Sequence, residues 1–202
     1  MSMQKIAVKR KKNVCHHGDI RNSTILYATK LIEKKGDVVF TLREIAEGLG
    51  VSHVALLRHF HDKAAIVAEI AKCGYLGLIR EMESTISKDR GAVDCAKAYV
   101  KYGHSHSGEF RAMFHHSIKP FSQYPELLSI ASKSYSILRD EVEKMKPGAS
   151  QTVPLSIWGL AHGLTNLLID NQIDGALGKQ DSQSIFSALE AIELVVPKLI
   201  GR

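Results

Sequence analysis

The chain of 202 residues is 45% hydrophobic and 24% charged, an ordinary balance for one or two globular domains with a sizeable core. Its net charge is +6, and the excess is uneven: residues 1–90 hold sixteen Lys and Arg against ten Asp and Glu, whereas residues 91–202 hold eleven of each. Cys15, Cys73 and Cys95 form no Cys-x-x-Cys pair, which argues against a disulfide framework or a zinc knuckle. The clustered cations favour an anionic partner such as the phosphate backbone of DNA.

Residues 1–18 are expected to form a flexible basic arm. Lys9-Arg10-Lys11-Lys12 is a run of cations with no apolar periodicity beside it. On DNA such an arm can reach phosphates or the minor groove, and the sequence leaves open whether it does. The arm lacks the apolar stretch of a secretory signal, and no later run reaches the roughly 18 uninterrupted apolar residues that span a bilayer. We therefore expect a cytoplasmic protein without membrane contact.

Residues 41–60 predict two short helices joined by a tight turn. Thr41 can cap the first helix, and Glu44, three residues on, completes a capping-box pattern. Gly50 stands where the chain must turn with positive φ, and Ser52 can cap the second helix. The inner stripe of the first helix consists of Ile45, Ala46 and Leu49. This is the pattern of a helix-turn-helix, whose second helix enters the major groove of DNA.

The rest of the chain is expected to be helical throughout, because no segment shows the period-2 alternation of a strand. Asp62 can cap a long helix that connects the DNA-binding head to the body. Further helices are expected from Gly91 to Tyr102, around residues 110–116 and from Pro125 to Lys146, where Pro147-Gly148 gives a stop signal. With the two apolar helices that follow, this predicts an all-α protein of about nine helices.

The last two helices, expected around residues 153–169 and 185–199, are the most apolar. Leu160 and Leu167 extend the apolar surface of the first beyond one face, and a helix that is apolar on most sides must be buried on most sides. Gly159 and Gly163, one turn apart, would let another helix approach closely. Both stripes can instead close a monomer core. We expect a homodimer through the last two helices, which form a four-helix bundle with those of a twofold mate.

The head resembles the TetR family of bacterial one-component regulators over about residues 19–80. Two positions depart from the family pattern: Leu57 stands where the family usually has Tyr, a phosphate contact, and Val54-Ala55 replaces a Gly-Thr or Ala-Ala pair. The resemblance rests on residues that fall in order at the family's spacing, namely Ile25, Ala28, Ile32, Lys35-Gly36, Thr41, Ile45-Ala46, Gly50-Val51-Ser52, Leu56, His59-Phe60 and Asp62-Lys63.

A second resemblance extends over nearly the whole chain. Trp158, His162 and Gly163 are similar to the Trp-x-x-x-His-Gly signature of one C-terminal domain class of TetR-like regulators, and Tyr124-Pro125-Glu126-Leu127 lies upstream. Together the resemblances imply a flexible arm at 1–18, a helix-turn-helix DNA-binding domain at 19–66 and a ligand-binding and dimerisation domain at 67–202.

The predicted DNA contacts divide into base readers and backbone anchors. His53 can bond an acceptor such as guanine N7, whereas Val54 and Ala55 can only read thymine methyls or permit close approach. The family resemblance implies phosphate contacts at Thr41, Arg43, His59 and Lys63. The full predicted set is Thr41, Arg43, Ser52, His53, Val54, Ala55, Leu57, Arg58, His59 and Lys63.

Aromatic side chains of the central helices predict a small-molecule pocket, because such sites are apolar with a few polar anchors. The same aromatics can also be solid core. The predicted lining is Tyr99, Tyr102, His106, Phe110, Phe114, Tyr135, Trp158 and His162. No buried cation or anion pair is evident, so we expect a mostly apolar effector, aromatic or acyl-like, that is not highly charged.

The expected function is that of a ligand-responsive transcriptional repressor. A homodimer would bind a palindromic operator in double-stranded DNA, and a small-molecule effector would release it. Two alternatives stay open: an activator or nucleoid-associated factor without an effector, and an all-α metal- or ligand-binding protein without operator recognition. No catalytic arrangement and no cofactor motif stands out. No metal site is expected either, because His104 and His106 do not share a helix face.

Overall fold

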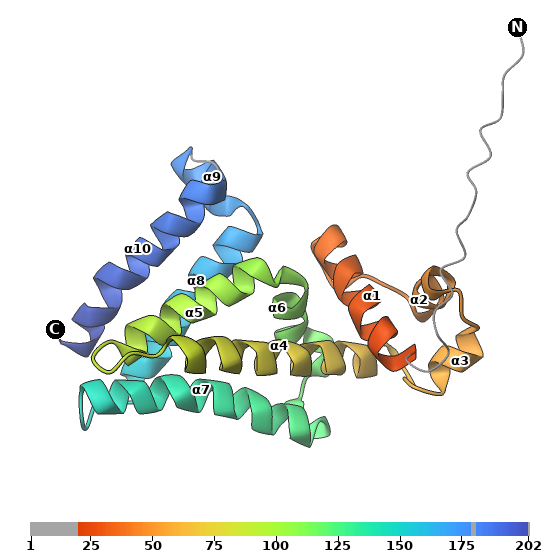
Figure 1. The fold of residues 1–202 in the computed structure, drawn as a ribbon, viewed down its shortest axis with the longest axis horizontal. Coiled ribbons are helices and arrows are strands. Elements are labelled where there is room, and N and C mark those ends of the chain that lie inside the picture. Colours follow the sequence, from red (N-terminus) through yellow and green to blue (C-terminus); the bar gives the residue numbers. More distant parts are fainter. Residues whose placement is uncertain (1–19, 179–180, 202) are drawn as a thin grey trace, which may run out of the picture.

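The computed structural model describes residues 20–178 and 181–201, and the N-terminal arm predicted at residues 1–18 lies outside them. The described residues form ten α-helices and two short 3-10 helices without any strand, which confirms the all-α prediction and gives slightly more than the nine helices expected (Figure 1). In order these are α1 (Ile20–Lys35), α2 (Leu42–Leu49), α3 (His53–Leu57), α4 (Lys63–Thr85), α5 (Gly91–Ser105), α6 (Ser107–Met113), η1 (His116–Ile118), η2 (Phe121–Gln123), α7 (Pro125–Met145), α8 (Thr152–Ile169), α9 (Gln172–Leu177) and α10 (Asp181–Ile200).

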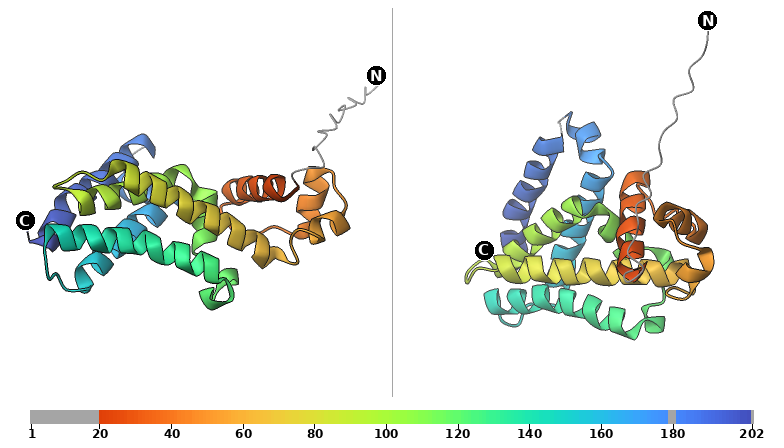
Figure 2. Two further views of the ribbon diagram at one scale, coloured as in Figure 1. Left: turned by 60° about the horizontal axis from the view of Figure 1, so that its bottom comes forward. Right: turned by 45° about the vertical axis from the view of Figure 1, so that its right-hand side comes forward.

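The first three helices form a head at one end of the molecule, and α4 leads from it into the body (Figures 1 and 2). A small core of Ile32, Ile45, Leu56 and Phe60 holds the head together, and each of these side chains is at most 2% exposed. Since α4 is unbroken, the domain boundary predicted between residues 66 and 67 falls inside this helix. Head and body therefore share one rigid element.

The turn between α2 and α3 follows from local sequence. Gly50 has φ 68° and ψ 28°, the left-handed conformation that glycine adopts without steric cost. The Ser52 hydroxyl then accepts the backbone N–H of Ala55 at 3.1 Å and caps α3. Ala46 on α2 is buried, 3% exposed, where a small side chain was expected at the helix crossing. These three features orient α3 across the head.

Only half of the predicted capping box forms at the start of α2. The Thr41 hydroxyl accepts the backbone N–H of Glu44 at 3.1 Å, as predicted. The Glu44 carboxylate does not accept the backbone N–H of Thr41, as a full capping box requires. It accepts hydrogen bonds from the Lys35 ammonium instead, at 2.7 and 2.9 Å. That hydrogen bond to Lys35 is the main reason why the pKa of Glu44 lies below its ordinary value. A charged partner at the end of α1 has replaced the neutral backbone donor.

The body is a helical bundle in which α5 lies between α4, α7 and α8. Its core includes Ile70, Leu78, Val100, Ile157 and Ile192, which are nearly or fully inaccessible to solvent. Helix α9, unexpected from the sequence, is a six-residue turn between α8 and α10. It was missed because so short a helix contains less than two turns of apolar periodicity.

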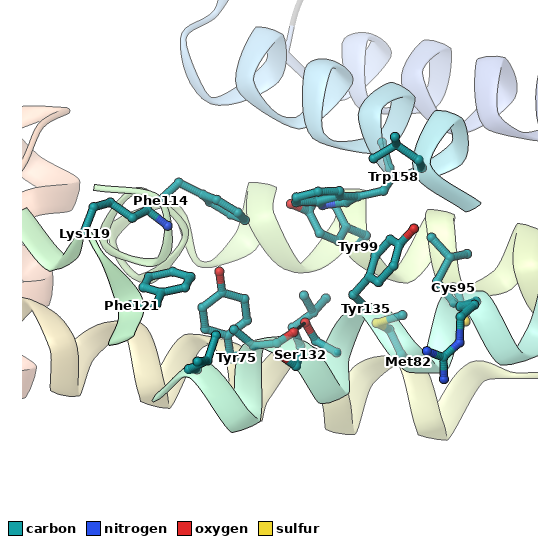
Figure 3. Close-up of a pocket in the computed structure, with 18 residues that line it drawn as sticks. Tyr75, Met82, Cys95, Tyr99, Phe114, Lys119, Phe121, Ser132, Tyr135 and Trp158 are labelled. Atoms are coloured by element: carbon teal, nitrogen blue, oxygen red, sulfur yellow. Dashed lines mark hydrogen bonds between the residues drawn. The ribbon is translucent and has the colours of Figure 1, made fainter. Parts of the chain in front are cut away.

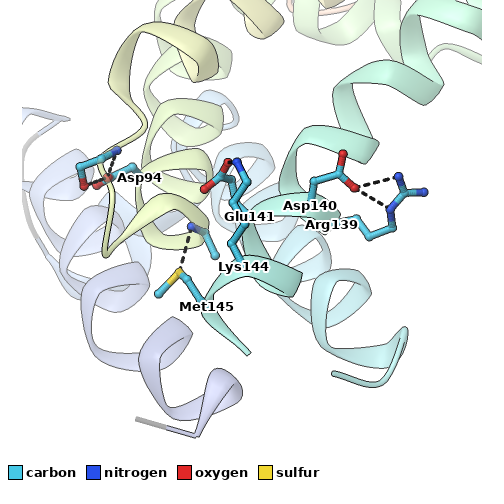
Figure 4. A network of polar contacts seen from close by, with 8 residues as sticks. Asp94, Arg139, Asp140, Glu141, Lys144 and Met145 are labelled. Atoms are coloured by element: carbon cyan, nitrogen blue, oxygen red, sulfur yellow. Dashed lines mark hydrogen bonds and ion pairs between the residues drawn. The ribbon is translucent and has the colours of Figure 1, made fainter. Parts of the chain in front are cut away.

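Polar contacts join the end of α7 to the start of α5 (Figure 4). The Glu141 carboxylate, 6% exposed, accepts the ammonium of Lys144 at 2.5 Å and lies against Gly91, the first residue of α5. A carboxylate near a helix N-terminus is stabilised by the helix dipole. The sulfur of Met145 also accepts the backbone N–H of Ala92 at 3.4 Å. These contacts fix α5 and α7, two helices that flank the cavity described below.

Candidate DNA-binding surface and effector cavity

Helix α3 presents one face to solvent. Leu56 is buried in the head, whereas Val54 is 63% exposed and Leu57 39% exposed. His53 and Arg58 are exposed beside them. Apolar side chains on the outside of a short helix, next to an imidazole and a guanidinium, form a surface that can contact thymine methyls, base acceptors and phosphates.

The remaining predicted DNA contacts flank this face. Thr41, Arg43, Ser52 and His59 are exposed, and Ala55 and Lys63 are half-buried. The oxygens of Thr41 and Ser52 accept cap bonds, so their hydroxyl protons stay available to donate to a phosphate. Arg43 Nε lies 2.9 Å from Glu47 Oε1, and both side chains extend into solvent. Such an exposed pair is weak and can be exchanged for a phosphate contact.

Lys63 has a structural role that sequence reasoning missed. Its ammonium donates to the backbone carbonyl of Val38 at 2.6 Å and stands 5.1 Å from the centroid of the Phe40 ring. The first residue of α4 thus holds the loop between α1 and α2. One ammonium has three protons, so a phosphate contact remains compatible with this bond.

A cavity of about 550 Å³ lies in the body between α4, α5, α7 and α8 (Figure 3). Four of the predicted residues line it: Tyr99, Phe114, Tyr135 and Trp158. Sequence reasoning missed the wall that α4 supplies and the segment between α6 and α7. The main additions are Tyr75, Leu78 and Met82 from α4, Leu128 and Leu138 from α7, and Lys119 and Phe121 from the intervening segment.

A chain of hydrogen bonds runs along one wall of the cavity. Trp158 Nε1 donates to the Tyr99 hydroxyl oxygen at 3.3 Å, and this oxygen also lies within hydrogen-bond distance of His162 Nδ1, at 2.9 Å. Burial lowers the pKa of the His162 imidazole and raises that of the Tyr99 phenol, so both groups are neutral at pH 7.

Phe110 and His162 lie behind the lining rather than in it. The ring of Phe110 packs edge-on against Tyr99, with centroids 5.6 Å apart, and lies 5.5 Å from His162. Phe110 is only 1% exposed. These two predicted residues support the cavity wall, and an occupant of the cavity would meet Tyr99 and Trp158 first.

Two predicted lining residues lie elsewhere, which corrects the sequence-based pocket. The Tyr102 hydroxyl donates to the Glu109 carboxylate, and the His106 ring stacks on Tyr102 with centroids 4.3 Å apart. Both line a separate pocket of about 530 Å³ beside Cys73. Tyr99 and Tyr102 are three residues apart on α5 and so point about 60° apart. That rotation suffices to direct them to different neighbours.

Two further features bear on the class of protein. Among the described residues, no group of three or more His, Cys, Asp or Glu is placed to hold a metal ion. In the same part of the chain one helix, α8, has the length and apolar composition of a membrane span. This is weak evidence for a span, because the core helix of a globular protein passes the same test.

Comparison with known proteins agrees with the geometry. Residues 26–70 match the family described as "Bacterial regulatory proteins, tetR family", and residues 93–191 match "Tetracyclin repressor-like, C-terminal domain". No curated protein sequence matches significantly.

Solved structures share the fold at low sequence identity. A tetR-family regulatory protein from Rhodococcus RHA1 superposes with a TM-score of 0.71 at 17% identity, covering 91% of this chain and 97% of that one. PfmR, a TetR-family regulator from Thermus thermophilus, gives 0.63 at 18% identity, with 86% and 96% covered. LfrR from Mycobacterium smegmatis, solved in complex with proflavine, gives 0.59 at 13% identity, with 87% and 94% covered. With both family regions in chain order and a helix-turn-helix head on a helical body, the chain belongs to the TetR family of transcriptional regulators.

Proposed function

We propose that this protein is a repressor that binds a palindromic operator as a homodimer and is released by a small, mostly apolar effector. The observation that carries the proposal is that two helices, α4 and α6, contact both the cavity and the head. The chain has three functional parts in this proposal: an arm at 1–18, a head at 19–66 and a body at 67–202. Helix α4 is shared between head and body.

Helix α4 connects the two sites along its length. Tyr75 and Met82, in its second half, line the cavity, while Lys63 at its start holds the head through the carbonyl of Val38. An occupant that displaces the cavity-lining half of a stiff helix also moves its first turn. The head would rotate with it, and the two recognition helices of a dimer would no longer match successive major grooves.

Helix α6 gives a second connection. Phe114, at its C-terminal end, lines the cavity. Gly108 lies so close to α1 that a Cβ there would stand 2.7 Å from the carbonyl oxygen of Thr29. His115 follows Phe114, and its pKa is lowered by burial and by the nearby charges of His116 and Lys63. The segment after α6 therefore lies within electrostatic reach of the head.

The outer faces of α8 and α10 support the dimer. On α8, Leu155 and Leu167 are 53% and 40% exposed, and Gly159 and Gly163 stand between them at four-residue spacing. Apart from chain neighbours and the nearby backbone of α8 itself, no atom that the structure describes comes within 4 Å of where a Cβ on either glycine would lie. Leu194 on α10 is 57% exposed. An apolar stripe with room for a close helix fits a twofold mate, and also explains why α8 is apolar enough to resemble a span.

The proposed site residues keep the roles predicted from the sequence. His53, Val54 and Ala55 read base edges, and Thr41, Arg43, His59 and Lys63 contact phosphates. The exposure of the α3 face and the free hydroxyl proton of Thr41 support this assignment. A regulator of this kind works where the chromosome is, so we place it in the bacterial cytoplasm.

The experiment combines DNA binding with the fluorescence of Trp158, the chain's single tryptophan. Operator binding is followed by anisotropy at several salt concentrations while apolar compounds are screened for a change in emission. Compounds that perturb Trp158 should release operator DNA in parallel. If every such compound leaves DNA affinity unchanged, the effector mechanism is wrong and a regulator without an effector is favoured. Binding that falls with salt but selects no sequence would favour a nucleoid-associated factor.

A further inference from the structure

The cavity is unbalanced in charge. Among the described residues that line it there are two cations, Lys119 and Arg139, and neither Asp nor Glu. The remaining lining is aromatic and aliphatic, with a few hydroxyl groups such as those of Ser132 and Ser134. Both cations are exposed to solvent as well as to the cavity. An occupant with an apolar body and one negative charge can therefore fill the cavity and pair with a cation at its opening.

The two cations are not equivalent. Arg139 donates from Nε and Nη2 to Asp140 Oδ1 at 3.0 and 2.8 Å, so a carboxylate already matches its charge (Figure 4). The Lys119 ammonium stands 3.2 Å from the centroid of the Phe121 ring. A cation–π contact positions an ammonium without neutralising it. Lys119 is exposed, but partial burial of its ammonium lowers its pKa, and no carboxylate in the described part of the chain offsets this.

The cavity is also polarised along its length. Figure 3 shows Lys119 with Phe114 and Phe121 at one end, and Met82 and Cys95 at the other. Burial raises the pKa of the Cys95 thiol to about 12, so this thiol stays uncharged. The cation without a carboxylate partner, Lys119, therefore lies at the end of the cavity away from Met82 and Cys95, while Arg139 is paired with Asp140.

We propose that the cavity binds an amphipathic monoanion: a carboxylate that pairs with Lys119, carried on an apolar body that extends past Tyr99 and Trp158 toward Met82. The sequence alone did not place Lys119 at the cavity, because this residue lies in a segment without the apolar periodicity that assigns helix faces. This assignment deepens the proposed function and rests on it only where the ligand is called an effector.

The position of Lys119 connects this ligand class to the head. Lys119 directly follows η1, in which Ile118 is fully buried and which packs against α4. A carboxylate that pulls the ammonium inward would therefore act on a segment that already contacts the head-bearing helix. A neutral ligand of the same shape would lack this attachment point.

The test compares an acid with its neutral amide on the same apolar body, here decanoic acid with decanamide and 2-naphthoic acid with 2-naphthamide. Binding to the full-length protein is measured by Trp158 emission and by calorimetry. Each acid should bind about tenfold more tightly than its amide, the size expected for one charge-assisted contact. Lys119→Gln should abolish that preference and Lys119→Arg should retain it. Lys133→Gln, an exposed lysine of α7 paired with Glu83, is the matched control and should leave the preference unchanged.

Equal affinity for acid and amide overturns the assignment, as does a preference that survives in Lys119→Gln. Absence of binding by both acids in both measurements overturns it as well. Operator release is measured separately on the same samples. If the acids bind through Lys119 but leave DNA affinity unchanged, the ligand class is supported and the effector mechanism of the proposed function fails.

Discussion

Ser52 shows how one side chain serves both the fold of the head and its proposed contact with DNA. Its oxygen accepts the backbone N–H of Ala55 and ends the turn that begins at Gly50. Its hydroxyl is exposed at the start of α3, where a helix N-terminus also attracts a phosphate. Substitutions at this position can separate the two roles, because some side chains cap a helix without tolerating a phosphate.

Ser52→Ala should lower the free energy of unfolding by about 1 kcal/mol, since the cap bond is lost. Ser52→Asp should keep the cap and the stability but weaken operator binding, because its carboxylate repels phosphates. Urea unfolding and DNA anisotropy measure the two effects. A Ser52→Asp protein that binds the operator as tightly as the wild type would show that Ser52 does not face the phosphate backbone.

His162 makes stability depend on pH. Burial lowers its pKa below the ordinary value of about 6.5, so between the folded and unfolded values the unfolded chain binds more protons. Stability is therefore fully present above pH 6.5 and is lost as the pH falls through the folded value. The pKa of His115 is lowered in the same direction.

Urea unfolding at pH 7.5 and pH 5.5 should accordingly give a lower stability at the acidic pH. His162→Gln should reduce this difference and leave the part that belongs to His115. His59→Gln, an exposed substitution in the head, serves as the control and should not change it. A full pH dependence in His162→Gln would contradict a neutral, buried imidazole at this position.

At the scale of elements, the helix caps and the tight turn were predictable from the sequence, because they depend only on neighbouring residues. The cap residues Thr41, Ser52 and Asp62 and the turn glycine Gly50 act within a few residues of their own backbone, and each is found in its predicted conformation or bond. Long-range contacts were not predictable, because periodicity shows which face of a helix is apolar but not which neighbour covers it. The hydrogen bond from Lys63 to a backbone carbonyl in the α1–α2 loop is one such contact that the sequence did not predict.

Part of the predicted pocket lining lies elsewhere for the same reason. Tyr99 and Tyr102 belong to one apolar face of α5, yet only Tyr99 lines the main cavity. Lys119 lies in a segment whose role depends on where the chain returns to the bundle, and no local pattern marks it. The site was thus predictable on helices with strong periodicity and unpredictable in the connections between them.

The contact between α6 and α1 can be tested at Gly108. A Cβ at this buried position would lie 2.7 Å from the Thr29 carbonyl oxygen, a backbone atom that cannot move without displacing α1. Gly108→Ala should therefore cost about 1–3 kcal/mol of stability through overpacking and alter the response of DNA binding to effector. Gly175→Ala, in α9 with nothing within 4 Å of the added Cβ, is the matched control and should be neutral or slightly stabilising. If both changes had equal effects on stability and on the response to effector, α6 would not connect the cavity to the head.

The outer face of α8 and α10 can be tested with one charge. Leu194→Arg places a cation on a side chain that is 57% exposed in the single chain, so the monomer should fold normally. In a four-helix bundle of two chains the same charge would be buried and would prevent association. Sedimentation at micromolar concentration should show a monomer with unchanged helicity. Leu26→Arg, at a 63% exposed position on α1, should remain dimeric, and a dimer in both variants would place the interface elsewhere.

The whole molecule has a head with an exposed recognition helix, a cavity in its body and an exposed apolar face on its last two long helices. Each part accounts for one step of the proposed cycle: DNA contact, effector binding and pairing of two heads. The steps depend on one another, because a single head reads too few bases for specific binding. Twofold pairing predicts that the preferred DNA has the same symmetry as the protein.

The most direct measurement is therefore selection of binding sites from randomised double-stranded DNA by the full-length protein at physiological salt. We predict enrichment of an inverted repeat whose half-site centres lie about one helical turn of DNA apart, or a multiple of it. His53→Ala should relax the preference at one position in each half-site by about 1–3 kcal/mol and leave the spacing unchanged. Enrichment of no sequence, or of single half-sites without symmetry, would contradict an operator-binding homodimer.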